Sequence, residues 1–391
     1  MDKSKSWKVG ISGGDSWVNS GDEAILVGTL QLLKNLESIR SITIITGNYN
    51  RTHEQFPDYD LINRNNIKEY IRGIKNIDVF FWGGGHLIQN TSSKLFLLYQ
   101  LFLVEIAIIL NKKVVGFCLG VEKINGKFWQ WLTKQVLNKF DLISVRDEYS
   151  LSILNDMGLK TQLILTADPA VLLRPSVQNI KKNDHKKPYV VVSPRKWFDY
   201  DSSFLPVKFQ RMINNKENTE FVHCIEVLAT ISDWIIEELG YGIYFISMYI
   251  ENEQNDNEVA KRIYSSMKNK NMVQIIDSQL KPIELINFIS NSEFLIGMRM
   301  HSTILGACAN VPIIGLYYQN KGRSFFESLD ISDLIIPIEE INKAELILII
   351  DKVINNRHQI SEKMKRNLFR QRELVKRTVE EIDRRIFRDG K

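Results

Sequence analysis

Residues 293–316, EFLIGMRMHSTILGACANVPIIGL, carry the pattern that decides the fold class. The apolar run at 293–296 predicts a short strand, residues 302–309 predict a helix, and the apolar run at 312–316 predicts a second strand. Ser302 suits a helix start, because its hydroxyl can accept a hydrogen bond from one of the first backbone N–H groups. A strand, a helix and a strand in this order indicate a parallel βαβ unit.

The alternation of strands and helices extends through most of the chain on both sides of this unit. Toward the N-terminus we predict strands at residues 8–12, 41–46, 78–82, 114–118 and 142–145. Residues 174–188 interrupt the pattern with two prolines and the polar run KKNDHKK, which indicates a linker. The predicted fold class is therefore α/β, with two doubly wound, Rossmann-like domains that face a cleft. The expected units are residues 1–175, residues 188–340 and a C-terminal helical tail at 341–391.

Composition excludes several classes of protein. The 391 residues are 44% hydrophobic and 25% charged, which is typical of a globular chain and not of a disordered or fibrous one. A net charge of +5 is too small to indicate nucleic-acid binding. The three cysteines lack the spacing of a metal site or a disulfide framework, so we predict no metal and a reducing compartment. The most apolar stretch, Leu95–Leu110, is shorter than the roughly 20 residues that span a bilayer, and predicts a buried helix in a cytoplasmic protein.

The predicted tail is rich in basic residues. From Arg357 to Lys391 it has 12 basic and 6 acidic side chains, and its apolar side chains at 364, 368, 375, 379, 382 and 386 form a helical stripe. One interpretation is a terminal helix that packs through this stripe and leaves a basic face in solvent. The alternative is peripheral contact between that basic face and anionic lipid, at the inner face of the cytoplasmic membrane.

Two cationic side chains lie at the end of the strand that opens the quoted stretch. Arg299 and His301 fall between that strand and the following helix, at the edge of an α/β sheet where ligands bind. The start of the helix also favours an anion. Residues 294–326 contain no acid but include Lys321 and Arg323, which favours a multiply charged anionic ligand. The alternative is a structural ion pair for Arg299 and a core histidine at 301.

Other strand ends carry further candidates. Arg195 follows the predicted strand at 189–193, and the run Trp82-Gly-Gly-Gly-His86 follows another strand. That run lacks the GxGxxG spacing of a dinucleotide site. At the start of the first helix, Asn19 or Ser20 can form the N-cap, and the acids of Asp22 and Glu23 complement the helix dipole.

Five motifs in order resemble the polysaccharide pyruvyl transferase family. They are NSGDEAIL at 19–26, FFWGGGHLIQN at 80–90, SVRDEYSLSIL at 144–154, ADPAVLL at 167–173 and GMRMHSTILGACANVPIIGL at 297–316. The resemblance implies a two-domain fold like that of GT-B glycosyltransferases. It also implies transfer of pyruvate from phosphoenolpyruvate to sugar hydroxyls of a surface or capsular polysaccharide precursor, forming a pyruvate ketal and releasing phosphate. Phosphoenolpyruvate is then a co-substrate, and no further cofactor is expected.

The resemblance also assigns roles to residues. The family's Arg–x–His triplet falls on Arg299 and His301, and its phosphoenolpyruvate-binding arginine falls on Arg195. Where members show a segment like Asp-Pro-Lys, this chain has Gln319-Asn320-Lys321, so the lysine is present and the acid is not.

We therefore expect His301 as the general acid, or alternatively as a phosphate contact. We expect Asp22 as the base, with Glu23, Asp147 and His86 as the alternatives. The expected phosphoenolpyruvate contacts are Arg195, Arg299, His301, Lys321 and Arg323. The expected residues of the acceptor side are Asn19, Asp22, Glu23, Gly84, Gly85, His86, Arg146 and Asp147. The acceptor is a saccharide, either free or lipid-linked. Two alternatives remain open: a GT-B glycosyltransferase that uses a nucleotide-sugar, and a non-catalytic saccharide-binding subunit.

Overall fold

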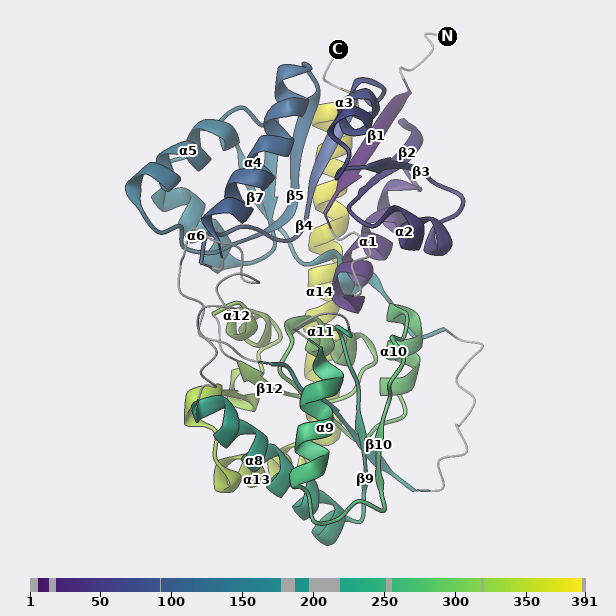
Figure 1. The fold of residues 1–391 in the computed structure, drawn as a ribbon, viewed down its shortest axis with the longest axis vertical. Helices are drawn as coiled ribbons and strands as arrows, with labels where there is room; N and C mark the ends of the chain where they lie inside the picture. The colour runs from purple at the N-terminus through teal and green to yellow at the C-terminus, as the bar shows by residue number, and fades with distance from the viewer. Residues whose placement is uncertain are drawn as a thin grey trace.

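Two parallel β-sheets form the framework of the molecule (Figure 1). The structure is a computed structural model that describes residues 6–13, 19–91, 93–176, 187–196, 219–250, 255–317 and 320–388, with the side chains at 320 and 321 left out. The first sheet has seven strands in the order β3-β2-β1-β4-β5-β6-β7, and the second has six in the order β10-β9-β8-β11-β12-β13. Helices cover both sheets, which confirms the predicted two-domain, GT-B-like α/β fold.

The first sheet and its helices come from the N-terminal part of the chain. In order they are β1 (Trp7–Ser12), α1 (Ser20–Leu33), β2 (Ile39–Thr46), α2 (Tyr49–Gln55), β3 (Asp60–Asn63), α3 (Ile67–Lys75), β4 (Val79–Ile88), α4 (Lys94–Ile109), β5 (Lys113–Val121), α5 (Lys127–Leu137), β6 (Leu142–Val145), α6 (Glu148–Asp156), β7 (Leu163–Leu165) and the 3₁₀ turn η1 (Pro169–Leu172). The central strands are apolar along their length because helices cover both faces of the sheet.

The second sheet repeats this plan. Its elements are β8 (Tyr189–Ser193), α8 (Thr219–Trp234), η3 (Ile235–Leu239), β9 (Gly242–Phe245), α9 (Asp256–Ser266), β10 (Val273–Ile275), α10 (Pro282–Ile289), β11 (Leu295–Gly297), α11 (Met300–Cys308), β12 (Ile313–Tyr317), α12 (Asn320–Ser328), η5 (Ser332–Leu334), β13 (Ile335–Pro337) and η6 (Ile338–Glu340). The quoted stretch is the predicted βαβ unit, β11-α11-β12. Its helix begins at Met300 instead of Ser302, and the Ser302 hydroxyl donates to the Arg299 carbonyl at 2.7 Å.

The strand order reverses once in each sheet. In the first sheet this happens between β1 and β4, and in the second between β8 and β11. The loops that leave two such neighbours at their carboxyl ends diverge to opposite faces, which opens a crevice where ligands bind in sheets of this kind. The topology therefore places the functional site after β1, β4, β8 and β11.

The C-terminal helices return the chain to the first domain. After α13 (Lys343–Asn355), the long helix α14 (Arg357–Ile382) runs along both domains, and η7 (Asp383–Arg388) packs on the first sheet (Figure 1). The apolar stripe is buried, as the packing interpretation predicts: Met364, Leu368, Val375, Val379, Ile382 and Ile386.

Many basic side chains of the tail are engaged within the protein. Arg372 Nε donates to the Val171 carbonyl at 2.6 Å, Lys376 pairs with Glu373, and Arg384 pairs with Glu381. The Arg372 contact joins α14 to η1 and favours the interpretation in which the tail packs on the protein, whereas the other two pairs lie within the tail itself. Among the described residues, no helix combines the length and the apolar character needed to span a membrane.

Candidate functional site

A cavity of about 200 Å³ lies between the two domains, at the carboxyl ends of their strands. Its walls come from the end of β4 and from the segments after β1, β6, β8, β9 and β11, so all four strands at the two reversals of strand order contribute to it. The lining residues are Asn19, Asp22, Gly85, His86, Arg146, Arg195, Met248, Tyr249, Arg299, Met300 and His301. Three arginines and two histidines face one acid, Asp22, among these residues, which suits an anionic ligand.

Arg299 is fixed by a buried acid. Its Nε and Nη2 donate to the two carboxylate oxygens of Asp256, each at 2.7 Å, and Asp256 also accepts the backbone N–H groups of Met248 and Tyr249. Burial raises the pKa of Asp256, and Arg299 opposes that rise. The structural ion pair considered from the sequence is therefore present, with its acid supplied by α9 from outside the acid-free stretch. Arg299 nevertheless lines the cavity.

His301 lies beside an acid of the other domain. Its Nε2 lies 3.4 Å from Oδ2 of Asp168, which also accepts from Nη1 of Arg146 at 2.6 Å. Burial acts to raise the pKa of Asp168, but His301 and Arg146 outweigh it and hold that pKa well below its usual range. The pair therefore places a carboxylate at the contact between the domains.

The start of α1 packs directly on His301. A Cβ atom at Gly21 would lie 2.5 Å from the His301 Nδ1 atom, so only glycine allows this approach. Asn19 is the N-cap: its side chain accepts from Gly21 N at 3.0 Å and donates to Asp22 at 2.8 Å. The N–H of Ser20 donates to the Met248 carbonyl at 2.9 Å, which joins α1 to the second domain.

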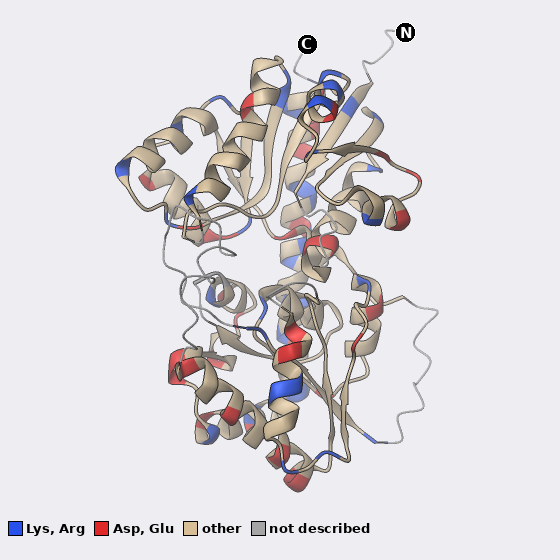
Figure 2. Cartoon of the chain, in the orientation of Figure 1, with Lys and Arg blue, Asp and Glu red and all other residues tan. Residues whose placement is uncertain are grey.

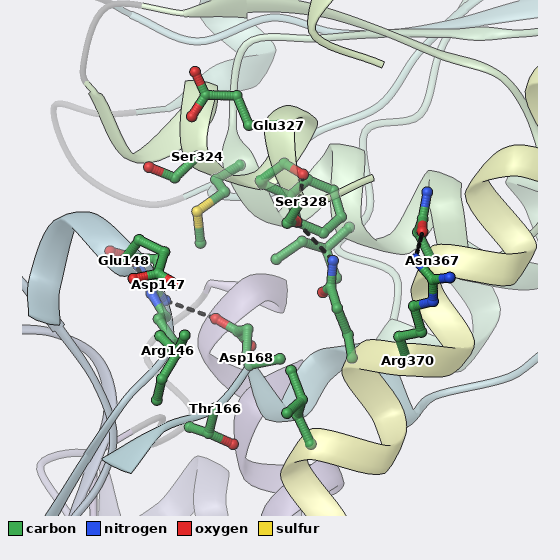
Figure 3. A pocket seen from close by; sticks show the side chains of 17 residues that line it. Arg146, Asp147, Glu148, Thr166, Asp168, Ser324, Glu327, Ser328, Asn367 and Arg370 are labelled. Atoms are coloured by element: carbon green, nitrogen blue, oxygen red, sulfur yellow. Dashed lines mark hydrogen bonds and ion pairs between the residues drawn. The ribbon is translucent and has the colours of Figure 1, made fainter. Parts of the chain in front are cut away.

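A larger cavity of about 460 Å³ adjoins the first and shares Arg146 and Met300 with it (Figure 3). It lies among α6, α11, α12, α14, the end of β7 and the segments after β6 and β7, and its walls combine carboxylates and amides with apolar side chains. Its other lining residues are Asp147, Glu148, Leu165, Thr166, Ala167, Asp168, Ile304, Ser324, Phe325, Glu327, Ser328, Asn367, Arg370, Gln371 and Leu374. In Figure 3 the Arg146–Asp168 pair lies on one side of this cavity, opposite α14.

The structure brings most of the predicted residues together. Eight line the smaller cavity: Asn19, Asp22, Gly85, His86, Arg146, Arg195, Arg299 and His301. Asp147 lines the larger one, where its side chain also caps α6 by accepting from Ser150 N at 2.7 Å. Gly84 precedes Gly85 on β4, has a positive φ of 77°, and does not line either cavity. The Lys321 side chain lies outside the described residues.

Two predicted contacts point elsewhere. Glu23 is buried beside Arg51 and Gln55 of α2, where burial raises its pKa, and it does not line either cavity. It follows Asp22 by one position, which turns its side chain about 100° around the helix axis. Arg323 is exposed on α12 and lines neither cavity, although it pairs at 2.8 Å with Glu327, which lines the larger one.

Asp168 and Asp256 were not predicted as site residues. Asp168 lies in the motif ADPAVLL, so the sequence held a signal for it, although that motif assigned it no role. Asp256 begins α9, and no motif marks it. Within the described ranges, no group of three or more His, Cys, Asp or Glu residues is arranged to hold a metal ion.

The sequence profile of the family described as "Polysaccharide pyruvyl transferase" matches residues 19–320. This chain belongs to the polysaccharide pyruvyl transferase family. The matched range includes the segments that line the smaller cavity, from Asn19 to His301. None of the curated proteins matches the chain in sequence.

Solved structures of low sequence identity share the fold of this family member. One is similar to this chain at 12% identity with a TM-score of 0.60: UDP-GlcNAc 2-epimerase from Neisseria meningitidis bound to UDP-GlcNAc, where the match covers 96% of this chain and 99% of that chain. Anabaena Alr3699/HepE in complex with UDP-glucose has 8% identity, a TM-score of 0.61, and coverage of 96% and 98%. The UDP co-structure of MnaA from S. aureus has 12% identity, a TM-score of 0.59, and coverage of 92% and 90%. At these identities the similarity concerns the fold alone.

Proposed function

We propose that this family member transfers pyruvate from phosphoenolpyruvate to two hydroxyls of one sugar, forming a ketal and releasing phosphate, during synthesis of a surface or capsular polysaccharide. The observation that carries the proposal is the convergence of Arg146, Arg195, Arg299 and His301 on one small cavity between the domains. Family membership supports the reaction type. The proposed location is the cytoplasm, including the inner face of the cytoplasmic membrane for a lipid-linked acceptor.

The arginines of the smaller cavity are the proposed contacts of the donor, and Asp256 and Asp168 already balance the charges of two of them, Arg299 and Arg146. Phosphoenolpyruvate carries a phosphate and a carboxylate, with about three negative charges near neutral pH. Guanidinium groups bind both anions through paired N–H donors. Arg299 is pre-oriented by Asp256, so little side-chain entropy is lost when the donor binds. Arg195 enters from the end of β8 and is the second proposed contact.

The reaction needs an acid, a base and a binding site for the leaving phosphate. A proton added to C3 of phosphoenolpyruvate makes C2 electrophilic, and one sugar oxygen then bonds to C2 while its proton passes to a base. The second sugar oxygen displaces phosphate from C2, and its proton leaves with the phosphate. His301 is the proposed proton donor, Asp168 orients its ring, and Asp22, which lines the same cavity, is the proposed base. No metal or further cofactor enters this scheme.

The larger cavity is the proposed acceptor site. It adjoins the donor cavity, with which it shares Arg146 and Met300, and this proximity supports the proposal. Carboxylates and amides bind sugar hydroxyls, and its apolar side chains can cover one face of a sugar ring. Arg146 and Asp147, both predicted for the acceptor side, contribute to this wall.

Thermal unfolding with millimolar phosphoenolpyruvate tests the donor. A ligand at 100 times its Kd stabilises the folded state by about 2.7 kcal/mol, which raises Tm by several degrees. We expect this shift in the wild type and its loss in Arg195→Gln. The matched control is Arg323→Gln, which removes an exposed arginine outside both cavities and should keep the shift. A wild type without a shift, or equal shifts in Arg195→Gln and wild type, contradicts the proposal.

A nucleotide-sugar transferase is the second candidate function. The structural neighbours named above were solved with UDP or UDP-sugars, and they share the fold of this chain. The same melting experiment with UDP-glucose and UDP-GlcNAc separates the two candidates. A shift with a UDP-sugar and none with phosphoenolpyruvate favours the nucleotide-sugar reaction. A melting shift with a saccharide, and none with phosphoenolpyruvate or with a UDP-sugar, favours a non-catalytic subunit.

A further inference from the structure

The helix α4 is apolar on both of its faces. Its inner residues, including Leu97, Leu101 and Val104, are buried against the sheet. The outer residues Phe102 and Ile109 are 50% and 72% exposed, although a helix on the surface of a globular protein normally turns polar residues to water. The sequence predicted a buried helix here, and the structure buries only one face of it.

The neighbouring helix α5 extends the exposed apolar area. Phe128 and Trp131 are 61% and 56% exposed, their rings lie 6.1 Å apart, and α5 contacts α4 on the same face of the first sheet (Figure 1). We call these exposed side chains the α4–α5 surface. Its members are Leu98, Tyr99, Phe102, Ile109, Phe128 and Trp131. A concentration of large exposed apolar side chains marks an interaction site.

Basic side chains outnumber acids on and beside these two helices. Lys94 begins α4, Lys123 and Lys127 precede and begin α5, and Lys134 and Lys139 lie on and just after α5, against one acid of α4, Glu105. Lys112 and Lys113 are engaged elsewhere, because their Nζ atoms donate to the carbonyls of Lys75, Ile77 and Ile386. Glu105 pairs with Lys139 at 2.6 Å. In Figure 2 both helices are mostly uncharged, with basic residues near their ends.

We propose that the α4–α5 surface docks on an anionic lipid bilayer. Phenylalanine, tryptophan and leucine side chains insert at the boundary between headgroups and acyl chains, while lysines around them meet anionic headgroups. A second copy of this chain fits less well. A two-fold interface would bring the same lysine-rich rim together from both protomers, and like charges would oppose each other.

This surface also lies near the edge of the sheet that carries the cavities. The helices α4 and α5 follow β4 and β5, so their first turns start at the carboxyl edge of the sheet. Phe128 belongs to the first turn of α5, and Leu98 directly follows the first turn of α4. Docking there brings the cleft toward the bilayer, where a lipid-linked sugar is found; this last step rests on the proposed function. The lipid contact is thereby assigned to the first domain and not to the basic C-terminal tail.

Vesicle sedimentation of the full chain tests the proposal. The probes are vesicles of phosphatidylglycerol and phosphatidylcholine in equal amounts, and vesicles of phosphatidylcholine alone. We expect the wild type to pellet with the anionic vesicles, and the double variant Phe128→Ser/Trp131→Ser to bind them at least about tenfold more weakly. The matched control is Leu348→Ser/Phe369→Ser, which removes two comparably exposed apolar side chains from α13 and α14 and should bind as the wild type does.

Three outcomes overturn the proposal. The wild type stays in the supernatant with anionic vesicles, the control variant loses binding as much as the Phe128/Trp131 variant, or light scattering shows a dimer that the Phe128/Trp131 variant breaks. The last outcome assigns the surface to a second copy. The melting shift with phosphoenolpyruvate should be the same in wild type and in Phe128→Ser/Trp131→Ser. Failure of docking and failure of the proposed function are therefore measured separately.

Discussion

His301 Nε2 lies 3.4 Å from Asp168 Oδ2, and this pair joins the two domains across the cleft. His301 is in the first turn of α11 on the second sheet, while Asp168 follows β7 of the first sheet and caps η1 by accepting from Ala170 N at 3.0 Å. Arg146 donates a hydrogen bond to Asp168 Oδ2, the same oxygen that lies near His301. The orientation of the proposed proton donor therefore depends on closure of the two domains.

Asp168→Asn should lower the free energy of unfolding and abolish the melting shift with phosphoenolpyruvate. Asparagine keeps the shape and the cap, but it leaves the buried Arg146 with only the longer 3.7 Å contact to Asp147, so we expect a loss of unfolding free energy near pH 7 of up to about 3 kcal/mol. The pKa of Asp168 is lowered in the fold, so its stabilising contribution is present above the ordinary carboxyl pKa of about 3.9 and is lost as pH falls below it. Denaturant unfolding from pH 7 down to about pH 2.5 should show the difference between variant and wild type shrinking.

Asp233→Asn is the matched control for that series. Asp233 is also buried, but it accepts backbone N–H groups of Lys268 and Asn269, away from the cavities. This variant should keep the phosphoenolpyruvate-dependent melting shift that Asp168→Asn loses. A stability difference for Asp168→Asn that stays constant with pH would refute the role given to its carboxylate.

Arg299→Ala should lose stability as well as donor binding, and the loss should grow with pH. Burial raises the pKa of Asp256, and Arg299 is the main group that opposes it, so removing the guanidinium raises that pKa further. A carboxyl with a raised folded pKa favours the fold only while protonated. Stability of the variant should therefore be highest below about pH 4 and should fall as pH rises through the folded pKa. Melting curves from pH 4 to pH 8 measure this.

The double variant Arg299→Ala/Asp256→Asn separates folding from function. It removes the buried negative charge together with its partner, so most of the stability should return near pH 7. The melting shift with phosphoenolpyruvate should stay absent, because the cavity still lacks its arginine. Recovery of the shift in the double variant would show that Arg299 acts only as a structural ion pair.

The sequence was sufficient to place Arg299 and His301, because both follow a short apolar strand and precede a helix. Parallel βαβ units turn such positions to one edge of a sheet, and that edge carries the cavity. Their acidic partners were not predictable from local pattern. Asp256 lies 43 residues before Arg299, and Asp168 comes from the other domain, so no helical or strand periodicity connects them.

Arg323 shows where the prediction of ligand contacts from local charge fails. It was assigned to the ligand because residues 294–326 contain no acid, yet Glu327 lies one position beyond that stretch and one helical turn from Arg323. Arginine and glutamate four residues apart on a helix pair on its surface. That spacing was visible in the sequence. Charge counted over a stretch was therefore a weaker guide than charge placed on a helix face.

Gly21→Ala should damage the site more than the fold. The added Cβ would lie 2.5 Å from Nδ1 of His301, so either the ring or α1 must move, and the contact with Asp168 is disturbed. Gly73→Ala on α3 is the control, because its Cβ would also lie 2.5 Å from a side chain, that of Ile62, outside both cavities. We expect comparable melting temperatures without ligand, and a phosphoenolpyruvate shift that only Gly21→Ala loses. Equal shifts in the two variants would contradict the tight packing of α1 on His301.

Phe387→Ala should destabilise the chain although it lies close to the C-terminus. The Phe387 ring is buried between Trp7 and Phe81, with ring centroids 5.9 Å and 6.3 Å away, and its carbonyl accepts from the Trp7 indole at 3.0 Å. Truncating a buried phenylalanine costs about 3 to 5 kcal/mol.

The exposed Phe369 on α14 provides the control, and Phe369→Ala should change the unfolding free energy by less than about 0.5 kcal/mol. Because Phe387 packs on the first sheet and lines neither cavity, the phosphoenolpyruvate shift should survive in both variants. Equal unfolding free energies for the two variants in denaturant titrations would mean that η7 is not part of the first domain's core. The chain would then end as a tail that only lies along the two domains, and the basic face of α14 would again be a candidate for the membrane contact assigned above to α4 and α5.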